Sequence, residues 1–375
     1  MALNPDQYRL SETEHQAVFE SNIKPELFAG TKEAVRPVAV IFGGQPGAGK
    51  SAAMEPAVAE LYQRGGAVEI IGDDLRDYHP QYHRLMKADD RTAAFYTDRD
   101  AGRWVEKAIT EAKAQRVNIV IEGTMRDGNT VARTMQSLRE AGYQIDARAL
   151  AVTWRLSEQG ILQRYENQKA DRGVGRMTTP EAHKAGYEGM LQTLERIEGE
   201  KLADRVMIHR RGGEVIYCNE LQGGQWLREP QARAVVEAER ARPMTLQERE
   251  DYARGFEKLA AMLERPERQA SAAEIGHVND LWQRAKQGLV AEVFRQEPPE
   301  KALQQYPELA WAYAHMRATE AKAEANGLTA EQRADVADLV RENLAMALEQ
   351  GTIPPVDGRE DMEVAASRLR DLEGR

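Results

Sequence analysis

This sequence of 375 residues has a single cysteine, no long apolar run and no excess of basic residues. The lone Cys218 excludes an intramolecular disulfide, which fits a reducing compartment. No stretch approaches the roughly 20 apolar residues that a membrane-spanning helix needs. Residues Met1–Arg36 are polar and lack the basic start and apolar core of a secretory signal. We therefore expect a cytoplasmic protein that does not associate with membranes.

The charge balance is acidic, with 51 lysines and arginines against 61 aspartates and glutamates and a formal net charge of −10. Such a balance argues against nonspecific nucleic-acid binding, because the negatively charged phosphate backbone repels an acidic protein. We expect no nucleic-acid partner. The hydrophobic share of 42% is ample for a sizeable core, and the length favours two domains.

In the first half of the chain, short apolar runs alternate with segments of helical pattern. Runs that are apolar on both faces are typical of central strands in a parallel sheet. They lie at Val38–Phe42, Ala67–Ile71, Val117–Ile121 and Ala147–Val152. Helices are expected between them, at Ser51–Arg64, Asp98–Gln115 and Asp127–Ala141. The alternation predicts an α/β fold in which helices flank a parallel sheet, with an edge hairpin at Val206–His209 and Val215–Cys218.

The composition changes near Arg228, where glycine becomes scarce and Ala, Glu, Arg and Leu dominate at helical spacing. This pattern predicts an all-α C-terminal region of about four to six helices. We therefore expect two domains, residues 1–227 and residues 228–375. The second is open to three interpretations: a stabilising appendage, a docking surface for another protein, or an inhibitor acting in cis.

One segment matches the phosphate-binding pattern G-x-x-x-x-G-K-[ST]. It follows an apolar run and precedes a helical segment, as the mechanism requires. Lys50 is expected to reach the β- and γ-phosphates of ATP, and the Ser51 hydroxyl to ligate Mg²⁺. The predicted nucleotide-binding residues are Gly44, Gln45, Pro46, Gly47, Ala48, Gly49, Lys50 and Ser51.

Acidic residues follow two of the predicted strands. Asp73 and Asp74 come after Ala67–Ile71, and Glu122 follows Val117–Ile121. Ligands of open α/β sheets bind beyond the carboxyl ends of the strands. Either aspartate could act there as a general base towards an attacking hydroxyl, while the other caps the following helix. Glu122 occupies the place where P-loop proteins often carry a second acidic motif, which favours a role near Mg²⁺.

Arginines gather after the fourth predicted strand. Arg164, Arg172 and Arg176 lie on a helix and loop where small-molecule kinases carry a closing lid. Arginines on such a lid stabilise the negative charge of a phosphoryl group in transfer. Phosphoryl transfer, rather than nucleotide sensing alone, is therefore the favoured chemistry.

Residues from about Phe42 to Asn219 resemble the zeta toxins, which are P-loop kinases of UDP-activated amino sugars. The match includes the P-loop with its Gln-Pro pair, the segment Gly72–Arg76, the strand end Glu122–Arg126, and the lid residues Arg164–Glu166 and Arg176–Pro180. The resemblance implies that Asp73 is the general base and that Arg164 and Arg176 stabilise charge. It also implies contacts to the sugar or Mg²⁺ from Glu106, Glu122, Thr124 and Arg126.

By this resemblance the protein phosphorylates a hydroxyl of a UDP-linked N-acetyl sugar, with UDP-N-acetylglucosamine as the first candidate. Depletion of a cell-wall precursor would make it a toxin, and the implied partner is a small helical antitoxin. Two alternatives remain: a P-loop kinase of another small molecule, such as an antibiotic or a nucleoside, and a non-catalytic nucleotide-binding regulatory module. The second alternative gives no role to a substrate base such as Asp73.

Overall fold

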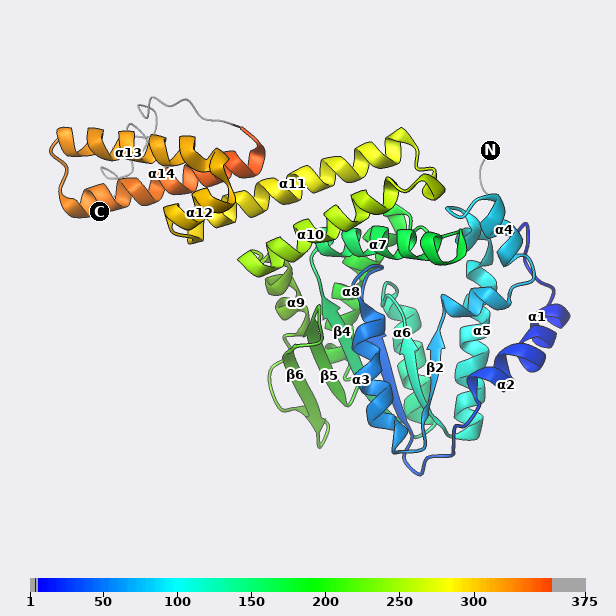
Figure 1. Ribbon diagram of the computed structural model, residues 1–375. Coiled ribbons are helices and arrows are strands. Elements are labelled where there is room, and N and C mark those ends of the chain that lie inside the picture. The colour runs from blue at the N-terminus through cyan, green and yellow to red at the C-terminus, as the bar shows by residue number, and fades with distance from the viewer. Residues whose placement is uncertain (1–3, 5, 353–375) are drawn as a thin grey trace. The chain divides into compact units, whose positions relative to one another are not determined.

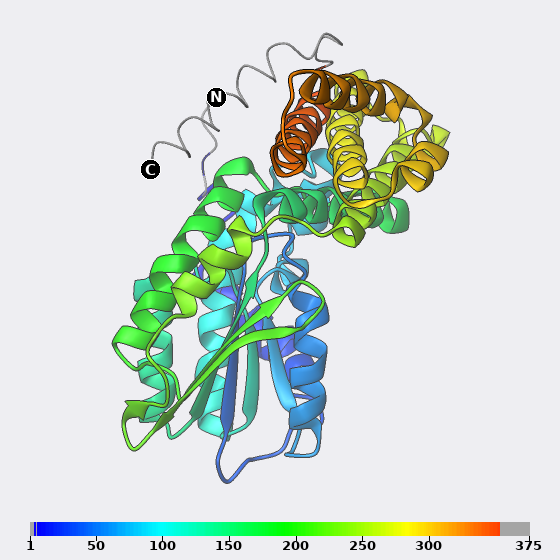
Figure 2. The same ribbon diagram turned by 90° about the vertical axis from the view of Figure 1, so that its left-hand side faces the viewer.

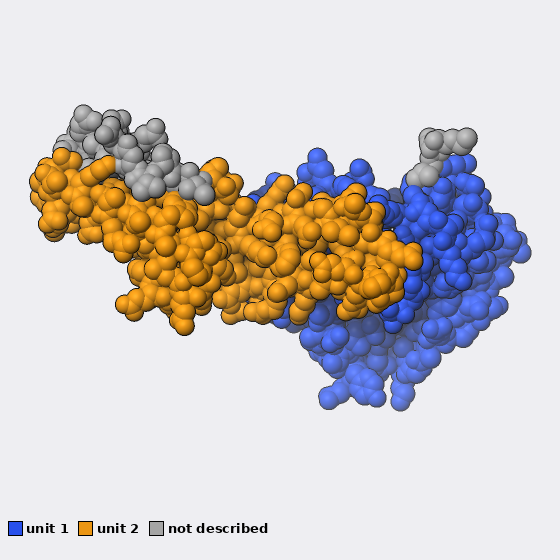
Figure 3. Space-filling view, turned by 45° about the horizontal axis from the view of Figure 1, so that its top comes forward, with its two compact units in different colours: residues 1–242 blue, residues 243–375 orange. Residues whose placement is uncertain are grey.

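The computed structural model describes residue 4 and residues 6–352. The chain forms two compact units, Met1–Arg242 and Pro243–Arg375, which Figure 3 distinguishes by colour. No helix among the described residues is long and apolar enough to cross a membrane. Each unit has its own secondary structure.

The first unit is built on a seven-stranded sheet with the strand order β2-β3-β1-β4-β5-β6-β7 (Figure 1). From β2 to β5 in this order, each strand is parallel to its neighbour, and β1 lies in the middle. Strands β6 and β7 extend the sheet with antiparallel pairing. Glu122 lies opposite both Phe42 and Ile71, so the carboxyl ends of β1, β2 and β3 meet at one edge. The strands are β1 (Val38–Gly43), β2 (Ala67–Ile71), β3 (Asn118–Glu122), β4 (Gln144–Ala151), β5 (Arg205–Arg210), β6 (Val215–Gln222) and β7 (Gln225–Trp226).

Alternate residues of the central strand β1 face two different cores. Ala39 and Ile41 pack with side chains of α5, α6, α8 and α9, while Val38 and Val40 pack with α3. Figure 2 shows α3 on one side of the sheet and α8 and α9 on the other. The helices of this unit are α1 (Glu12–Val18), η1 (Phe19–Ile23), α2 (Lys24–Leu27), α3 (Lys50–Tyr62), η2 (Asp74–Tyr78), α4 (Tyr82–Ala88), α5 (Ala93–Gln115), α6 (Gly128–Glu140), α7 (Trp154–Arg172), α8 (Pro180–Gly199) and α9 (Ala232–Ala241).

A buried polar cluster joins the N-terminal segment to α5. His15 stacks on Trp104 with ring centroids 4.7 Å apart, and the Trp104 indole donates to the His15 carbonyl oxygen at 3.0 Å. Asp100 accepts the Leu10 N–H at 3.0 Å and lies 3.5 Å from His79 Nε2. Because His79 ends the segment that begins with Asp73, this cluster also fixes one end of the segment at the tip of β2.

The second unit is entirely helical in its described part. Three of its helices begin with reciprocal capping boxes, such as Thr245 with Glu248 and Ser271 with Glu274, which satisfy the first backbone N–H groups. Phe256, Phe294 and Leu344 are almost fully buried between the helices. The helices are α10 (Leu246–Leu263), η3 (Pro266–Arg268), α11 (Ala272–Gln296), α12 (Pro299–Gln305), η4 (Pro307–Leu309), α13 (Ala310–Ala325) and α14 (Ala330–Gln350).

The predicted fold class is confirmed: a mainly parallel sheet flanked by helices precedes an all-α region. The division between the units differs from the expected one. It falls after Arg242 rather than after residue 227, because α9 packs Ala232 and Val236 into the core of the first unit. The helix expected from Asp98 begins earlier, at Ala93, and its N-cap Thr92 makes no side-chain capping bond.

Candidate active site

The P-loop connects β1 to α3 by a tight turn. Gly47 and Gly49 have φ angles of +76° and +90°, a conformation that residues with a Cβ rarely adopt. The turn closes on itself, because the Lys50 ammonium donates to the Gly44 carbonyl oxygen at 2.9 Å. The helix that begins at Lys50 has its N-terminus at this turn, which creates a site for an anion.

Glycines let two helices approach the back of the P-loop. A Cβ on Gly160 of α7 would lie 2.2 Å from the Gly47 carbonyl oxygen, so no other residue fits there without displacing the loop. A Cβ on Gly186 of α8 would lie 3.1 Å from Pro46 Cδ and 3.3 Å from Gln45 Cα. The P-loop is thus held from behind by direct backbone packing.

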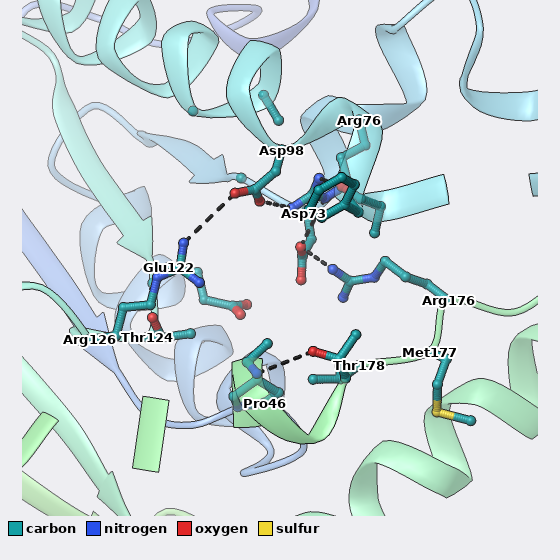
Figure 4. A pocket seen from close by; sticks show the side chains of 18 of the residues that line it. Pro46, Asp73, Arg76, Asp98, Glu122, Thr124, Arg126, Arg176, Met177 and Thr178 are labelled. Atoms are coloured by element: carbon teal, nitrogen blue, oxygen red, sulfur yellow. Dashed lines mark hydrogen bonds and ion pairs between the residues drawn. The ribbon is translucent and has the colours of Figure 1, made fainter. Parts of the chain in front are cut away.

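A cavity of about 630 Å³ opens in front of the P-loop (Figure 4). Seven cationic side chains line it, against three acidic ones, in a chain whose overall charge is negative. A cavity of this size and sign fits a phosphorylated small molecule. The charged lining residues are Lys50, Arg76, Arg91, Arg99, Arg126, Arg164 and Arg176, with Asp73, Asp98 and Glu122.

Asp73 lies where two arginines converge, as Figure 4 shows. Arg176 forms an ion pair with its carboxylate, and Arg76 Nε lies 3.3 Å from the same oxygen. Burial alone would raise the pKa of Asp73, but these arginines outweigh burial and hold the pKa well below its usual range. Asp73 is therefore ionised at every physiological pH.

Its neighbour Asp74 differs in both position and acidity. Asp74 is exposed and is not among the residues that line the cavity. Partial loss of hydration at this exposed position, together with the negative charges of Asp73 and Glu122, raises the pKa of Asp74. Of the two aspartates left open by the strand-end pattern, only Asp73 faces the cavity.

Asp98 of α5 links the arginines on the cavity's far wall. Arg76 Nη2 donates to it at 2.6 Å, and Arg126 Nη2 lies 3.7 Å from its other oxygen. The remaining donors of Arg76 reach the Ala94 carbonyl oxygen and Thr97. Arg76 is thereby fixed in the orientation that faces Asp73.

Lys50 and Glu122 meet at the strand ends. Their charged atoms lie 3.4 Å apart, and both side chains are largely buried. Burial lowers the pKa of Lys50, while the carboxylates of Glu122 and Asp73 oppose that shift. Ser51 directly follows Lys50 at the start of α3; it is exposed and is not among the residues that line the cavity. The hydroxyl and the carboxylate are both oxygen ligands of the kind that Mg²⁺ prefers.

Arg164 of α7 and Arg176 of the following loop bring positive charge to the cavity. Arg164 Nη2 donates to Thr178 Oγ1 at 2.6 Å, and its buried Nε has no hydrogen-bond partner among the described residues. Burial, reinforced by the charge of Arg176, lowers the pKa of Arg164 to about 10, so it remains cationic at neutral pH. An unpaired buried donor beside a second guanidinium is suited to a polyanionic ligand.

The loop that carries Arg176 is tied to the opposite side of the cavity by Asp90. This carboxylate, between α4 and α5, accepts the Tyr165 hydroxyl at 3.1 Å and the Gly175 N–H at 3.2 Å. Lys169 lies 3.2 Å from it. Since Gly175 directly precedes Arg176, Asp90 fixes the position from which this arginine enters the cavity.

The structure brings most of the predicted site residues together. Lys50, the P-loop Pro46, Asp73, both lid arginines and the strand-end residues Glu122, Thr124 and Arg126 all line the cavity. Glu106 is exposed on α5, one turn beyond the lining residue Gly102, and is not among the lining residues. Among the described residues, no group of three or more His, Cys, Asp or Glu side chains is arranged for a metal ion.

Several residues of the site were not predicted, among them Asp90, Asp98 and Arg76. Arg76 carries a local signal, because it follows Asp73 at the i,i+3 spacing of an ion pair. Asp98 stood at the expected start of a helix, where an acidic residue is ordinary. Asp90 makes its contacts only through the tertiary fold and leaves no pattern in the sequence.

Comparison with known proteins places this arrangement in a family. The Zeta toxin family model matches residues 26–222. Toxin PezT of Streptococcus pneumoniae serotype 4 is 29% identical over 208 residues, which are 55% of this chain and 81% of that protein. A Toxin zeta of Streptococcus pyogenes is 30% identical over 195 residues, which are 52% of this chain and 67% of that protein.

A solved structure has the same fold. It comes from work on the PezAT chromosomal toxin–antitoxin system of Streptococcus pneumoniae, and its TM-score to this chain is 0.59 at 25% sequence identity. The match covers 69% of this chain and 100% of that one. The family model ends at residue 222, before α9 and the second unit.

Proposed function

This chain belongs to the zeta toxin family, and from that premise we propose that it transfers the γ-phosphoryl group of ATP to a hydroxyl of a UDP-activated N-acetyl amino sugar. UDP-N-acetylglucosamine is the first candidate. The observation that carries the proposal is the placement of one ionised carboxylate, Asp73, in a cationic cavity directly in front of the P-loop. A site that only sensed nucleotide would need no carboxylate facing the phosphates.

Asp73 serves as the base in this mechanism. The sugar hydroxyl attacks the γ-phosphorus, the bond to the bridging oxygen of ADP breaks, and the hydroxyl proton passes to the Asp73 carboxylate. Its lowered pKa makes Asp73 a weak base while Arg176 is paired with it. When Arg176 turns to the phosphoryl oxygens, Asp73 loses that partner and its proton affinity rises.

The cations stabilise the charge in transfer. Lys50 pairs with the β- and γ-phosphates, and Arg164 and Arg176 face the equatorial oxygens of the phosphoryl group. Thr124, Arg126 and Glu106 position the sugar. Of these three, Thr124 and Arg126 line the cavity, which supports the assignment for them more directly than for Glu106.

Mg²⁺ would be held by the Ser51 hydroxyl and by Glu122, directly or through water. The oxygen chemistry of these two residues and their position beside Lys50 fit such an ion. When bound, it neutralises phosphate charge. Glu122 meanwhile keeps Lys50 oriented, since the two charged atoms lie 3.4 Å apart.

We extend the biological role from the relatives. Consumption of a cell-wall precursor would make this chain a toxin, and a small helical antitoxin would be its partner. The similar S. pneumoniae proteins are named as a toxin and as a toxin–antitoxin system. Cytoplasmic localisation follows from the substrate.

The test is mass spectrometry of a panel of UDP-sugars incubated with the protein, ATP and Mg²⁺. We expect a product heavier by one phosphoryl group from UDP-N-acetylglucosamine and none with the Lys50→Ala variant. A protein that binds ATP but modifies no UDP-sugar would refute the proposed acceptor. The same assay with nucleosides and aminoglycosides would then identify another one.

A further inference from the structure

The last turn of α9 reaches the P-loop. Arg240 Nη2 donates to Gln45 Oε1 at 3.1 Å, across 195 positions of sequence. Residue 240 lies outside residues 26–222, which the family model matches. A contact to the P-loop therefore comes from a part of the chain that the family comparison does not cover.

Gln45 depends on this contact because its side chain is fully buried. Its amide nitrogen donates to the Val152 carbonyl oxygen at 2.7 Å and lies 3.3 Å from Ser157 Oγ. Both hydrogens of the amide are thus directed towards the end of β4 and the start of α7. The amide oxygen faces the other way, and Arg240 is the donor that satisfies it. A buried acceptor that loses its donor is unstable in that position.

Arg240 is itself held rigidly. Its Nη1 donates to the Tyr187 carbonyl oxygen at 2.8 Å, and its guanidinium lies 3.7 Å from the centroid of the Tyr187 ring. Burial lowers the pKa of Arg240 to about 10, which leaves it cationic at neutral pH. One planar guanidinium thus bridges α8 and the P-loop, with both terminal nitrogens in use.

The position of Gln45 determines the shape of the P-loop turn. Its carbonyl oxygen accepts the Ala48 N–H at 3.2 Å, and Lys50 Nζ lies 3.4 Å from the same oxygen. These bonds set the direction of the backbone N–H groups and of the lysine that are expected to bind phosphate.

We propose that Arg240 is a positioning residue for the nucleotide, acting through Gln45 to hold the P-loop in its phosphate-binding shape. This proposal rests on the proposed binding of ATP. It gives α9, the helix before the second unit, a role in nucleotide affinity that neither the P-loop motif nor the family model contains.

The experiment is calorimetric titration of the full-length protein with Mg-ATP. Arg240→Met should weaken binding about tenfold, in the range expected for a hydrogen bond to a charged group. Arg240→Lys should not restore affinity, because one ammonium cannot reach both acceptors from the ring of Tyr187. The matched control is Arg233→Met on the same helix, where Arg233 pairs with Glu195 and Glu237 at the surface. Its affinity should equal that of the wild type.

A double-mutant cycle separates positioning from general stability. Gln45→Met breaks the same hydrogen bond from the other side, so the double variant should bind ATP no more weakly than the weaker single variant. Unchanged affinity in Arg240→Met, or losses that simply add, would overturn the inference while leaving ATP binding intact. If Arg240→Met does not fold, Gln45→Met with unchanged affinity overturns it equally. If the wild type does not bind Mg-ATP, the proposed function fails and the inference fails with it.

Discussion

At the scale of single residues, Asp73 shows how a site can be assembled around one carboxylate. Arg76 is locked by α5 and fixes one side of Asp73, whereas Arg176 approaches from a loop. The two arginines differ in what they can do next. Arg76 has its donors occupied within the protein, so Arg176 is the one that can exchange the carboxylate for a phosphate.

Replacement of Asp73 by asparagine tests its role. We expect Asp73→Asn to lower the rate of phosphoryl transfer by a factor of about 10² to 10⁴, because the shape is kept but the proton acceptor is lost. ATP should bind at least as tightly as before, since Arg176 no longer has a competing carboxylate. Steady-state rates and an ATP titration would measure the two effects. Asp74→Asn is the control and should be nearly normal; a larger loss there would move the base to Asp74.

The residues that could be predicted are those with a local signature. Lys50 follows from the P-loop pattern, because a short motif specifies its backbone geometry. The acidic strand end leaves Asp73 and Asp74 as candidates for the base, and the resemblance to the zeta toxins implies Asp73. Arg240 and Asp90 contact residues of the site that are far from them in sequence, and no local sequence motif indicates these contacts. Their roles depend on how helices pack, which a single sequence does not specify.

At the scale of elements, the approach of α7 to the P-loop is the tightest contact of the site. Gly160→Ala would place a Cβ 2.2 Å from the Gly47 carbonyl oxygen. Helix propensity alone favours alanine over glycine by about 1 kcal/mol, so any loss must come from this collision. We expect ATP affinity to fall more than tenfold, worth at least about 1.4 kcal/mol.

The control for this variant is Gly276→Ala on α11, where an added Cβ would meet nothing within 4 Å. It should leave ATP affinity unchanged and raise the free energy of unfolding slightly. Titration with ATP and urea unfolding would give both quantities. Equal ATP affinity in the two variants would show that the P-loop can move away from the added Cβ without losing its ability to bind ATP.

The buried His183 of α8 is expected to make the free energy of unfolding depend on pH. Its Nε2 lies 2.8 Å from Ser157 Oγ, and its ring packs at an interplanar angle of 33° against Trp154. Burial, aided by the charge of Arg240, lowers the pKa of His183 from 6.5 to about 4. The folded protein therefore keeps His183 neutral at pH values where the unfolded chain binds a proton.

The sign of the effect follows from that difference. The contribution of His183 to stability is complete above pH 6.5 and is lost as the pH falls towards about 4, by at most about 1.4 kcal/mol per pH unit. Urea unfolding at about pH 7, 6 and 5 should show a shallower decline in His183→Asn than in the wild type. Identical declines would mean that the ring is protonated in the fold. Other buried histidines contribute equally to both proteins.

The sequence predicts the strands of the parallel sheet better than it predicts where helix α5 starts. The strands of the parallel sheet were found because they are apolar on both faces, as at β1, where every residue is buried. The sequence predicts that helix α5 starts at Asp98, whereas it begins one turn earlier, at Ala93, after the N-cap Thr92. That turn places Ala94 and Phe95 in the cavity wall, so a difference of five residues at one helix boundary leaves part of the site out of the prediction.

At the scale of the whole molecule, the boundary after Arg242 predicts how the chain can be divided. A chain of residues 1–242 should fold and bind ATP, because it keeps the core of the first unit intact. A chain of residues 1–227 lacks α9 and uncovers the partners of the fully buried Ala232 and Val236. It should be less stable by at least about 2 kcal/mol.

Urea unfolding followed by tryptophan fluorescence, together with ATP titration, compares the two truncations. Equal stability of both chains would show that α9 does not belong to the first unit energetically. The full-length protein is the reference for both. If sugar-dependent ADP release by residues 1–242 rose tenfold over the full-length protein, the second unit would be an inhibitor in cis rather than an appendage or docking surface.

The contact between Gly160 and Gly47 has a consequence for how such chains can vary. Arg164 lies one helical turn after Gly160, so its distance from the P-loop is fixed through α7 alone. Arg176 is reached only through the loop after Arg172. An insertion or deletion in that loop would displace Arg176 and leave Arg164 in register. A change in the loop's length therefore moves one cationic side chain of the cavity relative to the P-loop while the other keeps its distance from it.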